Sequence, residues 1–448
     1  MKILLYQSVK WLLRCRFALP VVVWYLRLRI HIDTPKELRG CNAKRTLLAL
    51  SPERFIGDLE ILAATGEFQV YRLEKSIVDV LISFCWDKSL HLKYTLEPGA
   101  CEVPAQLEIN RARLRSFYQM LLPKLYKSIG VDAVIGAAVH YRQDHDWGVV
   151  SKEIGVPYIV LFKECLITNK KHHYRIVDFY SRFDRECVNS IVVHNEKSKH
   201  AIEASGIVEK DRVVSLGCLR MDSFVSSLPL IDGVTNKGGK VVLLFSFPHG
   251  VGLYGLTHNF PDAKSTGFFR LFESVHQVIG KLSLEMKDTT FIIKPKWPGQ
   301  WLRYIERELE SVGVNWKKSS NLSIVFDETA QDLIMKSDVV VSFGSTTMLE
   351  AAIANKPVIV PLYHEATEEI YKEYIQLVDT FEVLDCADSP ENLDELIRDR
   401  LKNWSIDSKT IKKRRELFSE YISPVSGGAI QKYVDHICDE ISRANNTR

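Results

Sequence analysis

The segment 337–362 combines a strand-like apolar run with side chains that could bind a phosphate. It reads SDVVVSFGSTTMLEAAIANKPVIVPL. A buried strand over Val339–Ser342 would run into Gly344, which lacks a side chain and so lets the backbone turn tightly and approach a ligand. At the helix start that follows, hydroxyl groups and free backbone N–H groups would come from Ser345, Thr346 and Thr347. The partial positive charge of a helix start favours phosphate, so the segment predicts a phosphate-binding loop.

Glu350 lies one helical turn beyond these hydroxyl groups. A carboxylate at that place could accept hydrogen bonds from the two hydroxyl groups of a ribose. The alternative is that Thr347 and Glu350 form a capping box, in which the two side chains bind backbone N–H groups of the first helical turn. The local sequence is compatible with both interpretations.

Two further segments place a polar side chain after a predicted strand. The run 291–296 predicts a strand that ends at Lys294, because Pro295 interrupts it. Strand ends face the ligand crevice of an open parallel sheet, so Lys294 could meet a donor phosphate. The run 244–250 predicts a strand followed by His249, which titrates near neutral pH and could carry a proton or bind a phosphate. The alternatives are a solvated lysine and a structural histidine.

The first half of the chain offers two carboxylates after predicted strands. The run YIVLFKECL at 158–166 would deliver Lys163 and Glu164 to a strand end, where partial desolvation would raise the Glu164 pKa and suit acid–base catalysis. The run VVSLGCLRMD at 213–222 carries Arg220, which could bind an anion, and Asp222, which could act as nucleophile or base on a sugar. Two carboxylates flanking one sugar are the layout that glycosyl chemistry uses. The alternative is an Asp–Arg pair that fixes an interdomain linker.

Three other polar runs are expected to lie in loops or on solvated faces and not to take part in catalysis. In HYRQDHD at 140–146, Asp144 and Asp146 could suggest a metal, but the two histidines lack a third ligand at helical spacing. We therefore expect a solvated loop there and no bound metal. We also expect a polar loop over 170–173, which could touch acceptor phosphate or lipid head groups, and a solvated basic face over 412–415.

Short runs rich in Val, Ile and Leu alternate with helical stretches along the chain, a pattern typical of parallel strands covered on both faces. The expected fold class is therefore α/β, with strands and helices alternating along the chain. Strands are expected over 46–50, 69–73, 78–84, 131–139, 158–162, 190–194, 213–217, 241–247, 290–294, 323–326, 339–342, 358–362 and 381–384. Helices are expected over 56–65, 107–129, 196–205, 268–287, 301–312, 331–336, 348–354, 390–403, 409–421 and 429–443.

This pattern restarts once, after a segment rich in Pro, Gly and Ser at 223–240. We therefore expect a first domain over 45–222, carrying the catalytic carboxylates and the acceptor, and a second over 241–425, carrying the donor. A final helix over 426–448 would cross back to the first domain.

Composition excludes several classes of protein. The chain has 448 residues, of which 46% are hydrophobic and 26% charged, the balance of an ordinary globular protein and not of a disordered or collagen-like chain. No apolar run reaches the roughly 18 residues that a membrane span needs. Nine scattered cysteines, none in a Cys-x-x-Cys pair, are typical of a reducing cytosol.

The charge is concentrated at the start of the chain. Residues 1–45 hold ten Lys and Arg against two acids, a net charge of +8 within a total of +3. The segment 1–44 could lie on an anionic membrane surface, or it could be a basic helix that packs on the first domain. No nucleic-acid-binding motif accompanies the basic residues, so we expect no nucleic-acid partner.

The hydroxyl-rich segment, followed by Ala351-Ala352 and Lys356-Pro357-Val358-Ile359, resembles the nucleotide-binding half of GT-B glycosyltransferases. Taken with the Lys-Glu pair after a strand and the Arg-x-Asp pair, the chain resembles the retaining β-Kdo transferases of bacterial surface polysaccharide assembly. The alternating pattern covers residues 45–445. This resemblance implies two facing Rossmann-like domains with a cleft between them, no metal and no other cofactor.

The resemblance also implies a function, namely transfer of a sugar from a nucleotide-sugar donor, with CMP-Kdo favoured, to a growing polysaccharide or a lipid-linked glycan. The enzyme would work in the cytoplasm, peripheral at the inner membrane. The donor would be held by Lys294, Gly344, Ser345, Thr346, Thr347 and Glu350, helped by Arg220 and Lys163. Catalysis would fall to Asp222, Glu164 and His249.

Three other functions remain open on the sequence. A UDP-sugar 2-epimerase on the same scaffold would turn over a nucleotide sugar without an acceptor. A CDP-glycerol-type phosphotransferase would release CMP and transfer phosphate. A non-catalytic partner of a polysaccharide assembly complex would be indifferent to nucleotides and to changes at Glu164 or Asp222.

Overall fold

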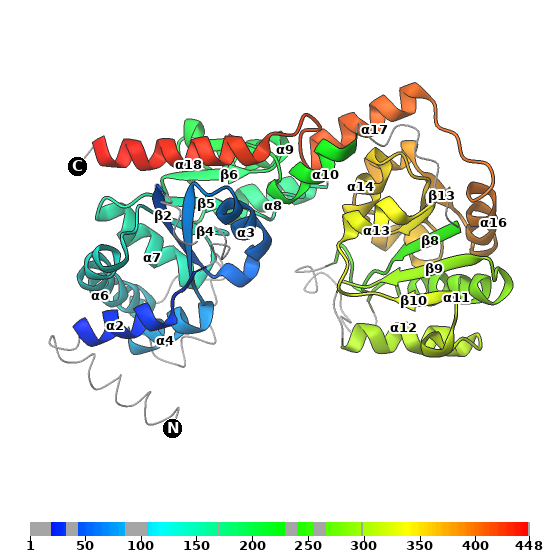
Figure 1. Cartoon of the computed structure of the whole chain (residues 1–448), viewed down its shortest axis with the longest axis horizontal. Helices are drawn as coiled ribbons and strands as arrows, with labels where there is room; N and C mark the ends of the chain where they lie inside the picture. Colours follow the sequence, from blue (N-terminus) through cyan, green and yellow to red (C-terminus); the bar gives the residue numbers. More distant parts are fainter. Residues whose placement is uncertain are drawn as a thin grey trace. The chain divides into compact units, whose positions relative to one another are not determined.

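The computed structural model describes residues 19–32, 44–85, 105–168, 170–183, 185, 187–228, 240–253, 266–296 and 299–446. The chain forms two compact units, one from residues 1–223 and 421–448, the other from residues 224–420. Within each unit, helices cover both faces of a sheet (Figure 1). Of the expected basic segment, 1–18 and 33–43 lie outside the described residues, as do 229–239 of the expected linker.

The sheet of the first unit has seven strands in the order β1-β3-β2-β4-β5-β6-β7. Neighbouring strands are parallel, except that β1 pairs antiparallel with β3. The strands are β1 (His31–Ile32), β2 (Arg45–Leu50), β3 (Phe68–Leu73), β4 (Ala133–Gly136), β5 (Tyr158–Leu161), β6 (Ser190–Val193) and β7 (Val213–Ser215). The helices are α2 (Leu19–Arg29), α3 (Ile56–Ala64), α4 (Lys75–Cys85), α6 (Ala105–Ile129), α7 (Arg142–Glu153), α8 (Lys170–Tyr180), α9 (Glu196–Ser205) and α18 (Ala429–Asn446).

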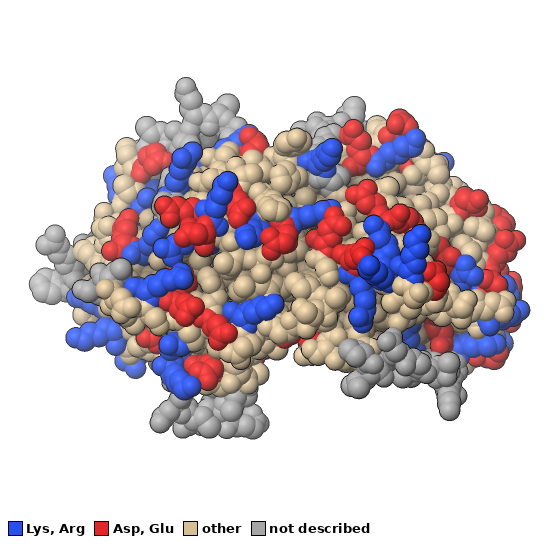
Figure 2. Space-filling model, turned by 90° about the horizontal axis from the view of Figure 1, so that it is seen from above, with Lys and Arg blue, Asp and Glu red and all other residues tan. Residues whose placement is uncertain are grey.

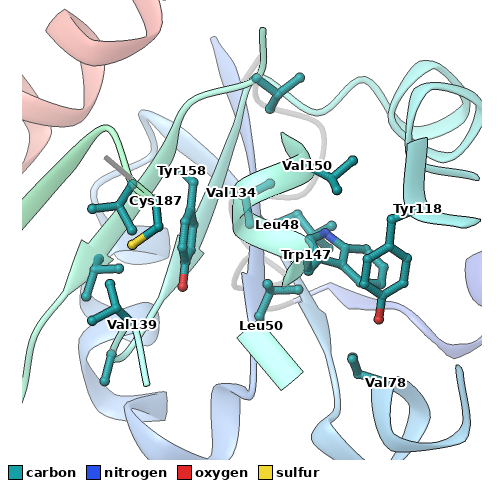
Figure 3. Packing of buried hydrophobic residues seen from close by; sticks show 14 of the residues in the cluster. Leu48, Leu50, Val78, Tyr118, Val134, Val139, Trp147, Val150, Tyr158 and Cys187 are labelled. Atoms are coloured by element: carbon teal, nitrogen blue, oxygen red, sulfur yellow. The ribbon is translucent and has the colours of Figure 1, made fainter. Parts of the chain in front are cut away.

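Apolar side chains cover both faces of this sheet. Successive side chains of a strand point to opposite faces, so Leu48 of β2 joins one buried cluster and Leu47 joins the other. Figure 3 shows the first cluster, in which Trp147 of α7 packs against Tyr118, with ring centroids 5.0 Å apart. The indole N–H of Trp147 donates to the Tyr126 hydroxyl at 2.7 Å, so its one polar group is satisfied inside the core.

The sheet of the second unit has six parallel strands in the order β10-β9-β8-β11-β12-β13. They are β8 (Lys240–Phe245), β9 (Thr289–Lys294), β10 (Leu322–Ile324), β11 (Val339–Ser342), β12 (Val358–Pro361) and β13 (Asp385–Ala387). The helices are α11 (Phe269–Glu285), α12 (Gln300–Ser311), α13 (Ala330–Lys336), α14 (Thr347–Ile353), α15 (Glu369–Lys372) and α16 (Pro390–Arg400). Two helices, α10 (Asp222–Ser227) and α17 (Ser408–Tyr421), include the residues at which the units divide.

Each sheet has one place where the strand order reverses. In the first unit the chain passes from β2 to β3 on one side and then returns to β4 on the other side of β2. In the second unit it passes from β8 to β9 and β10, and β11 then lies on the other side of β8. Ligands of open parallel sheets bind beyond the carboxyl ends of the strands at such switch points. The loops after β2 and β4, and those after β8 and β11, are therefore the places to look for a site.

The prediction of two Rossmann-like α/β units is confirmed by these two sheets. Two of the predicted strands are wrong. Residues 78–84 belong to helix α4, where Ile77, Val78, Leu81 and Ile82 are buried at the spacing of one helix face. Most of 381–384 lies in a 3-10 helix (Val378–Val383), and strand β13 begins after it. Short apolar runs do not distinguish a buried strand from a buried helix segment.

Two of the three polar runs expected to be loops or solvated faces differ from prediction, and the third, 412–415, is solvated at Lys412 and Lys413 but not at Arg414. Residues 142–146 open helix α7, and Asp144 is fully buried. Residues 170–173 open helix α8. In α17, Arg414 is buried and donates hydrogen bonds to the carbonyl oxygens of Val383, Ala352 and Lys356, and burial lowers its pKa to about 10. A charge can be buried in this way when neighbouring carbonyl groups accept its hydrogen bonds.

No helix among the described residues has both the length and the apolar character needed to cross a membrane.

Candidate functional site

The switch point of the second unit is formed by two loops that pack tightly on each other. Phe247, after β8, and Phe343, after β11, meet edge to face with ring centroids 5.1 Å apart. Gly344 adopts a left-handed backbone conformation, with φ of 60°. A Cβ atom there would lie 2.8 Å from a methyl carbon of Val251 in the other loop. Both the conformation and the space therefore require glycine at this position.

The hydroxyl groups predicted to bind phosphate form a network at this switch point. The Thr346 hydroxyl donates to one carboxylate oxygen of Glu350 at 2.8 Å, and the Gln331 amide donates to the other at 2.6 Å. The Ser345 hydroxyl oxygen accepts from the Thr347 backbone N–H at 3.3 Å. Glu350 is buried, whereas Ser345 and Thr346 are only half-buried and can reach a ligand.

The capping-box alternative for this segment is not what the structure shows. Thr347 is the first residue inside α14, and Thr346 occupies the N-cap position without a side-chain cap bond. The Glu350 carboxylate instead binds the side chains of Thr346 and Gln331. The network thus holds a carboxylate and two hydroxyl groups in fixed positions beside a tight backbone turn.

The structure places Lys294 and His249 at the same edge of this sheet. The Lys294 ammonium group ends β9 and donates to the Phe326 carbonyl at 2.9 Å, and burial lowers its pKa. The His249 ring packs against Phe269 and Tyr304, with centroids 4.3 and 4.8 Å away. Burial, followed by the nearby Arg307 charge, lowers the His249 pKa, so the ring is neutral at pH 7. Its Nε2 is buried without a hydrogen-bond partner in the described part of the chain.

The switch point of the first unit holds a buried carboxyl group that sequence analysis missed. Ser51 follows β2 in a left-handed conformation, with φ of 47°, and its hydroxyl donates to Asp144 at 2.6 Å. The other oxygen of Asp144 is buried without a partner among the described residues. Burial raises the Asp144 pKa to about 7, although Ser51 and the Arg54 charge oppose the shift. The group can therefore gain or lose a proton near neutral pH.

A sequence signal for Asp144 existed. Trp147, Val150 and Ser151 follow at helical spacing and are buried, so the pattern of a packed helix begins within the run that was expected to be a loop.

The Arg54 charge acts on this carboxyl group and lowers its pKa, whereas the Glu53 charge raises it. The Arg54 guanidinium group lies 3.4 Å from the centroid of the Tyr141 ring. His140 binds the Tyr180 hydroxyl at 2.8 Å, and burial lowers its pKa to about 4, so it is neutral at pH 7. The Lys163 ammonium group, at the end of β5, donates to the Arg54 carbonyl at 2.8 Å. The first switch point thus combines the Asp144 carboxyl group with the side chains of Arg54, His140 and Lys163.

Glu164 and Arg220 lie at the carboxyl edge of the same sheet. The Glu164 side chain is 58% exposed, so the predicted desolvation is not found, although the carboxylate can reach a substrate. It lies 3.8 Å from the Lys163 ammonium group. Arg220 pairs with the buried Asp58 at 3.5 Å. Burial raises the Asp58 pKa, and the charges of Arg220, His194 and Lys163 oppose that shift. Arg220 is half-exposed and so remains accessible to an anion.

The Asp222 carboxylate binds the backbone at the start of the C-terminal helix. Its two carboxylate oxygens accept hydrogen bonds from the backbone N–H groups of Ala429 and Ile430, at 3.0 and 3.1 Å. These are the first two residues of α18, so Asp222 caps the C-terminal helix from a distant part of the sequence. The side chain is also buried.

This cap leads to a prediction about stability. Asp222→Ala is expected to lower the free energy of unfolding by about 1–2 kcal/mol, because loss of a capping side chain leaves N–H groups of a helix start unsatisfied. Asp222→Asn keeps one acceptor oxygen and should lose less. Urea unfolding of the two variants, with activity measured alongside, separates capping from catalysis. Unchanged unfolding of Asp222→Ala would contradict the cap.

Among the described residues, no group of three or more His, Cys, Asp or Glu side chains is arranged to hold a metal ion. On the face seen in Figure 2, cationic and anionic side chains are interspersed over the described parts of both units and form no continuous basic surface there.

No protein-family model matches the chain, and no curated protein matches it. Similar solved structures include UDP-GlcNAc 2-epimerase from Neisseria meningitidis bound to UDP-GlcNAc, at 14% identity and a TM-score of 0.48, over 88% of this chain and 98% of that one. The 2-epimerase from Methanocaldococcus jannaschii has 11% identity and a TM-score of 0.47, over 88% and 99%. Anabaena Alr3699/HepE, in complex with UDP and glucose, has 12% identity and a TM-score of 0.43, over 88% and 100%. The fold assignment made above comes from the strand order of this chain itself.

Proposed function

We propose that this chain is an enzyme that transfers a sugar from a nucleotide-sugar donor to a glycan or a lipid-linked glycan. The observation that carries the proposal is the switch point of the second unit. There the tight turn at Gly344, the half-buried hydroxyl groups of Ser345 and Thr346, and the fixed carboxylate of Glu350 come together. Hydroxyl and backbone N–H groups suit the phosphates of a nucleotide, and a carboxylate suits the hydroxyl groups of its ribose.

The remaining residues of the second unit have roles within this proposal. Lys294 provides a positive charge for the donor phosphate. His249 would form one hydrogen bond to a phosphate or to the acceptor when a ligand reaches its buried Nε2. Thr347 holds Ser345 in place through its backbone N–H. These groups would bind and orient the donor without a metal ion.

The first unit provides the acid–base chemistry. Glu164 is the carboxylate with the access that a catalytic group needs, because most of its side chain is exposed beside Lys163. Lys163 and Arg220 would bind an anionic group of the donor sugar, and a Kdo donor carries such a carboxylate. CMP-Kdo is accordingly the first donor to assay. A lipid-linked acceptor would place the enzyme at the cytoplasmic face of the inner membrane.

A UDP-sugar 2-epimerase is the second candidate, and Asp144 is the observation that favours it. Inversion at a sugar carbon next to the anomeric centre requires a proton to be removed and returned. Asp144 lies at the switch point beside Ser51, and burial raises its pKa to about 7, so it could do both when a substrate reaches its buried carboxyl group. Epimerisation would need no acceptor, whereas transfer would need one.

The first experiment is a thermal-shift titration of the full-length protein with CMP, CDP, UDP and GDP. A ligand present at a hundred times its Kd stabilises by about 2.7 kcal/mol, which a melting curve resolves. Stabilisation by CMP alone supports the CMP-Kdo donor, and stabilisation by UDP supports a UDP-sugar enzyme. No shift with any of the four would contradict the proposal and favour a non-catalytic role.

A matched pair of variants locates the binding. Ser345→Ala/Thr346→Ala is expected to weaken nucleotide binding at least about tenfold, since two hydrogen bonds of about 1 kcal/mol each are lost. Ser311→Ala/Thr367→Ala removes two hydroxyl groups elsewhere in the same unit and should leave the shift unchanged.

Turnover distinguishes the two reactions. A UDP sugar incubated in deuterated water without acceptor gains deuterium at the inverted carbon only if the enzyme is an epimerase. A CDP-glycerol-type phosphotransferase would instead release CMP from CDP-glycerol.

A further inference from the structure

Helix α2 is held firmly on the first unit by one of its faces. Val22 and Leu26 are buried in the core cluster of that unit, and the helix packs on α6 (Figure 1). Directly after the helix, His31 and Ile32 pair with β3. The helix is therefore fixed both by its buried face and by the strand that follows it, so its outer face has a defined orientation.

The outer face of α2 is apolar. Val21, Trp24 and Leu28 are 46%, 62% and 61% exposed. They are spaced three and four residues apart, so they share one side of the helix. Large apolar side chains that are exposed next to one another, on a helix whose other face is already packed, mark an interaction surface.

Arginines lie on both sides of this apolar face. With about 100° of rotation per residue, Arg27 falls on one side of Trp24 and Leu28, and Arg29 falls on the other side of Val21. Both arginines are exposed, and Arg29 also lies 5.5 Å from the centroid of the Tyr25 ring. The helix contains no acidic residue, and the first 45 residues of the chain carry a net charge of +8.

We propose that the face of α2 formed by Val21, Trp24 and Leu28, flanked by Arg27 and Arg29, docks on an anionic lipid surface. Trp and Leu enter the boundary between head groups and acyl chains, and arginines attract the lipid phosphates. A second copy of the chain fits this face less well, because pairing two such helices would bring four arginines together. Docking does not depend on the proposed reaction, so the docking proposal and the proposed function are tested independently.

Co-sedimentation of the full-length protein with vesicles tests the docking. Binding is expected to vesicles of phosphatidylcholine with 30% phosphatidylglycerol, to be weaker on phosphatidylcholine alone, and to fall with added salt. Arg27→Ala/Arg29→Ala should reduce the partition coefficient about twenty-five-fold, at about fivefold for each arginine near an anionic surface. Trp24→Ser/Leu28→Ser should reduce it by more than about tenfold.

The controls match the variants. Leu284→Ser/Ile370→Ser removes two exposed apolar side chains from the second unit and should leave binding unchanged. All variants should melt at the parental temperature, since only exposed side chains change. Quenching of tryptophan fluorescence by brominated phosphatidylglycerol should decrease in Trp24→Phe, which identifies this helix and not another basic segment.

Three results would overturn the proposal. One is a parent protein that does not bind anionic vesicles, and another is undiminished binding by Trp24→Ser/Leu28→Ser. The third is a dimer in sedimentation equilibrium that the same variant dissociates, because the face would then pair with a second copy. Turnover of a water-soluble acceptor by the docking variants should equal that of the parent, which separates a failure of docking from a failure of the proposed reaction.

Discussion

Asp144→Asn is expected to make the protein more stable than the parent at pH 8 and to flatten its stability between about pH 4 and pH 7. In the folded parent, burial raises the pKa of this carboxyl group from 3.8 to about 7. Between these values the folded state holds a proton that the unfolded state has released, so stability falls as pH rises. This difference of about three pKa units lowers the parent's free energy of unfolding by up to about 4 kcal/mol at pH 8. Asparagine does not ionise, so the variant does not lose this free energy.

Urea unfolding at pH 5, 6, 7 and 8 measures this difference. The Asp144→Asn variant should already be the more stable protein at pH 5, and the difference in free energy of unfolding should grow up to about pH 7. Asp211→Asn is the matched control, because the Asp211 side chain lies in the same unit but is 75% exposed. Its pH profile should follow the parent within about 0.5 kcal/mol. Parallel profiles for Asp144→Asn and the parent would show that Asp144 is ionised in the folded state, and its proton-transfer role would then be dropped.

Glu164→Gln is expected to lower the turnover number by more than about a hundredfold while nucleotide binding stays intact. A positioned acid–base group contributes about 10²–10⁴ to a rate, and glutamine keeps the shape of glutamate but cannot exchange a proton at neutral pH. The nucleotide is proposed to bind through the second unit, so the thermal shift should not change. Initial rates at saturating donor, together with the shift, give both quantities.

A close control exists for this variant. Glu196 begins α9 in the same unit, is 64% exposed and lies 3.9 Å from the ammonium group of Lys199, much as Glu164 lies 3.8 Å from that of Lys163. Glu196→Gln therefore removes an equivalent exposed ion pair and should leave turnover unchanged. Equal rates for Glu164→Gln and Glu196→Gln would remove Glu164 from the proposed mechanism.

The architecture could be predicted from the sequence because buried parallel strands need continuous apolar runs. Val339–Ser342 and Tyr158–Leu161 are buried along their whole length, so apolar side chains fill most of their positions. The loop after β11 was predictable for a related reason. Gly344 and the three hydroxyl-bearing residues after it provide little apolar surface for a core. Helix α4 was not predictable in the same way. Its short apolar run fits both the two-residue repeat of a strand and the 3.6-residue repeat of a helix.

The roles of the remaining polar residues depend on contacts between segments that are distant in the sequence. Asp222 looked like a catalytic carboxylate beside an arginine, but its oxygens bind N–H groups more than 200 residues away. Asp144 looked like part of a solvated loop, and only the packing of α7 buries it and raises its pKa. The sequence by itself determined which segments are apolar and so where the strands and most helices lie. The tertiary structure alone decided which polar groups lose water and which meet a partner, because burial and hydrogen bonding depend on neighbours that the local sequence does not contain.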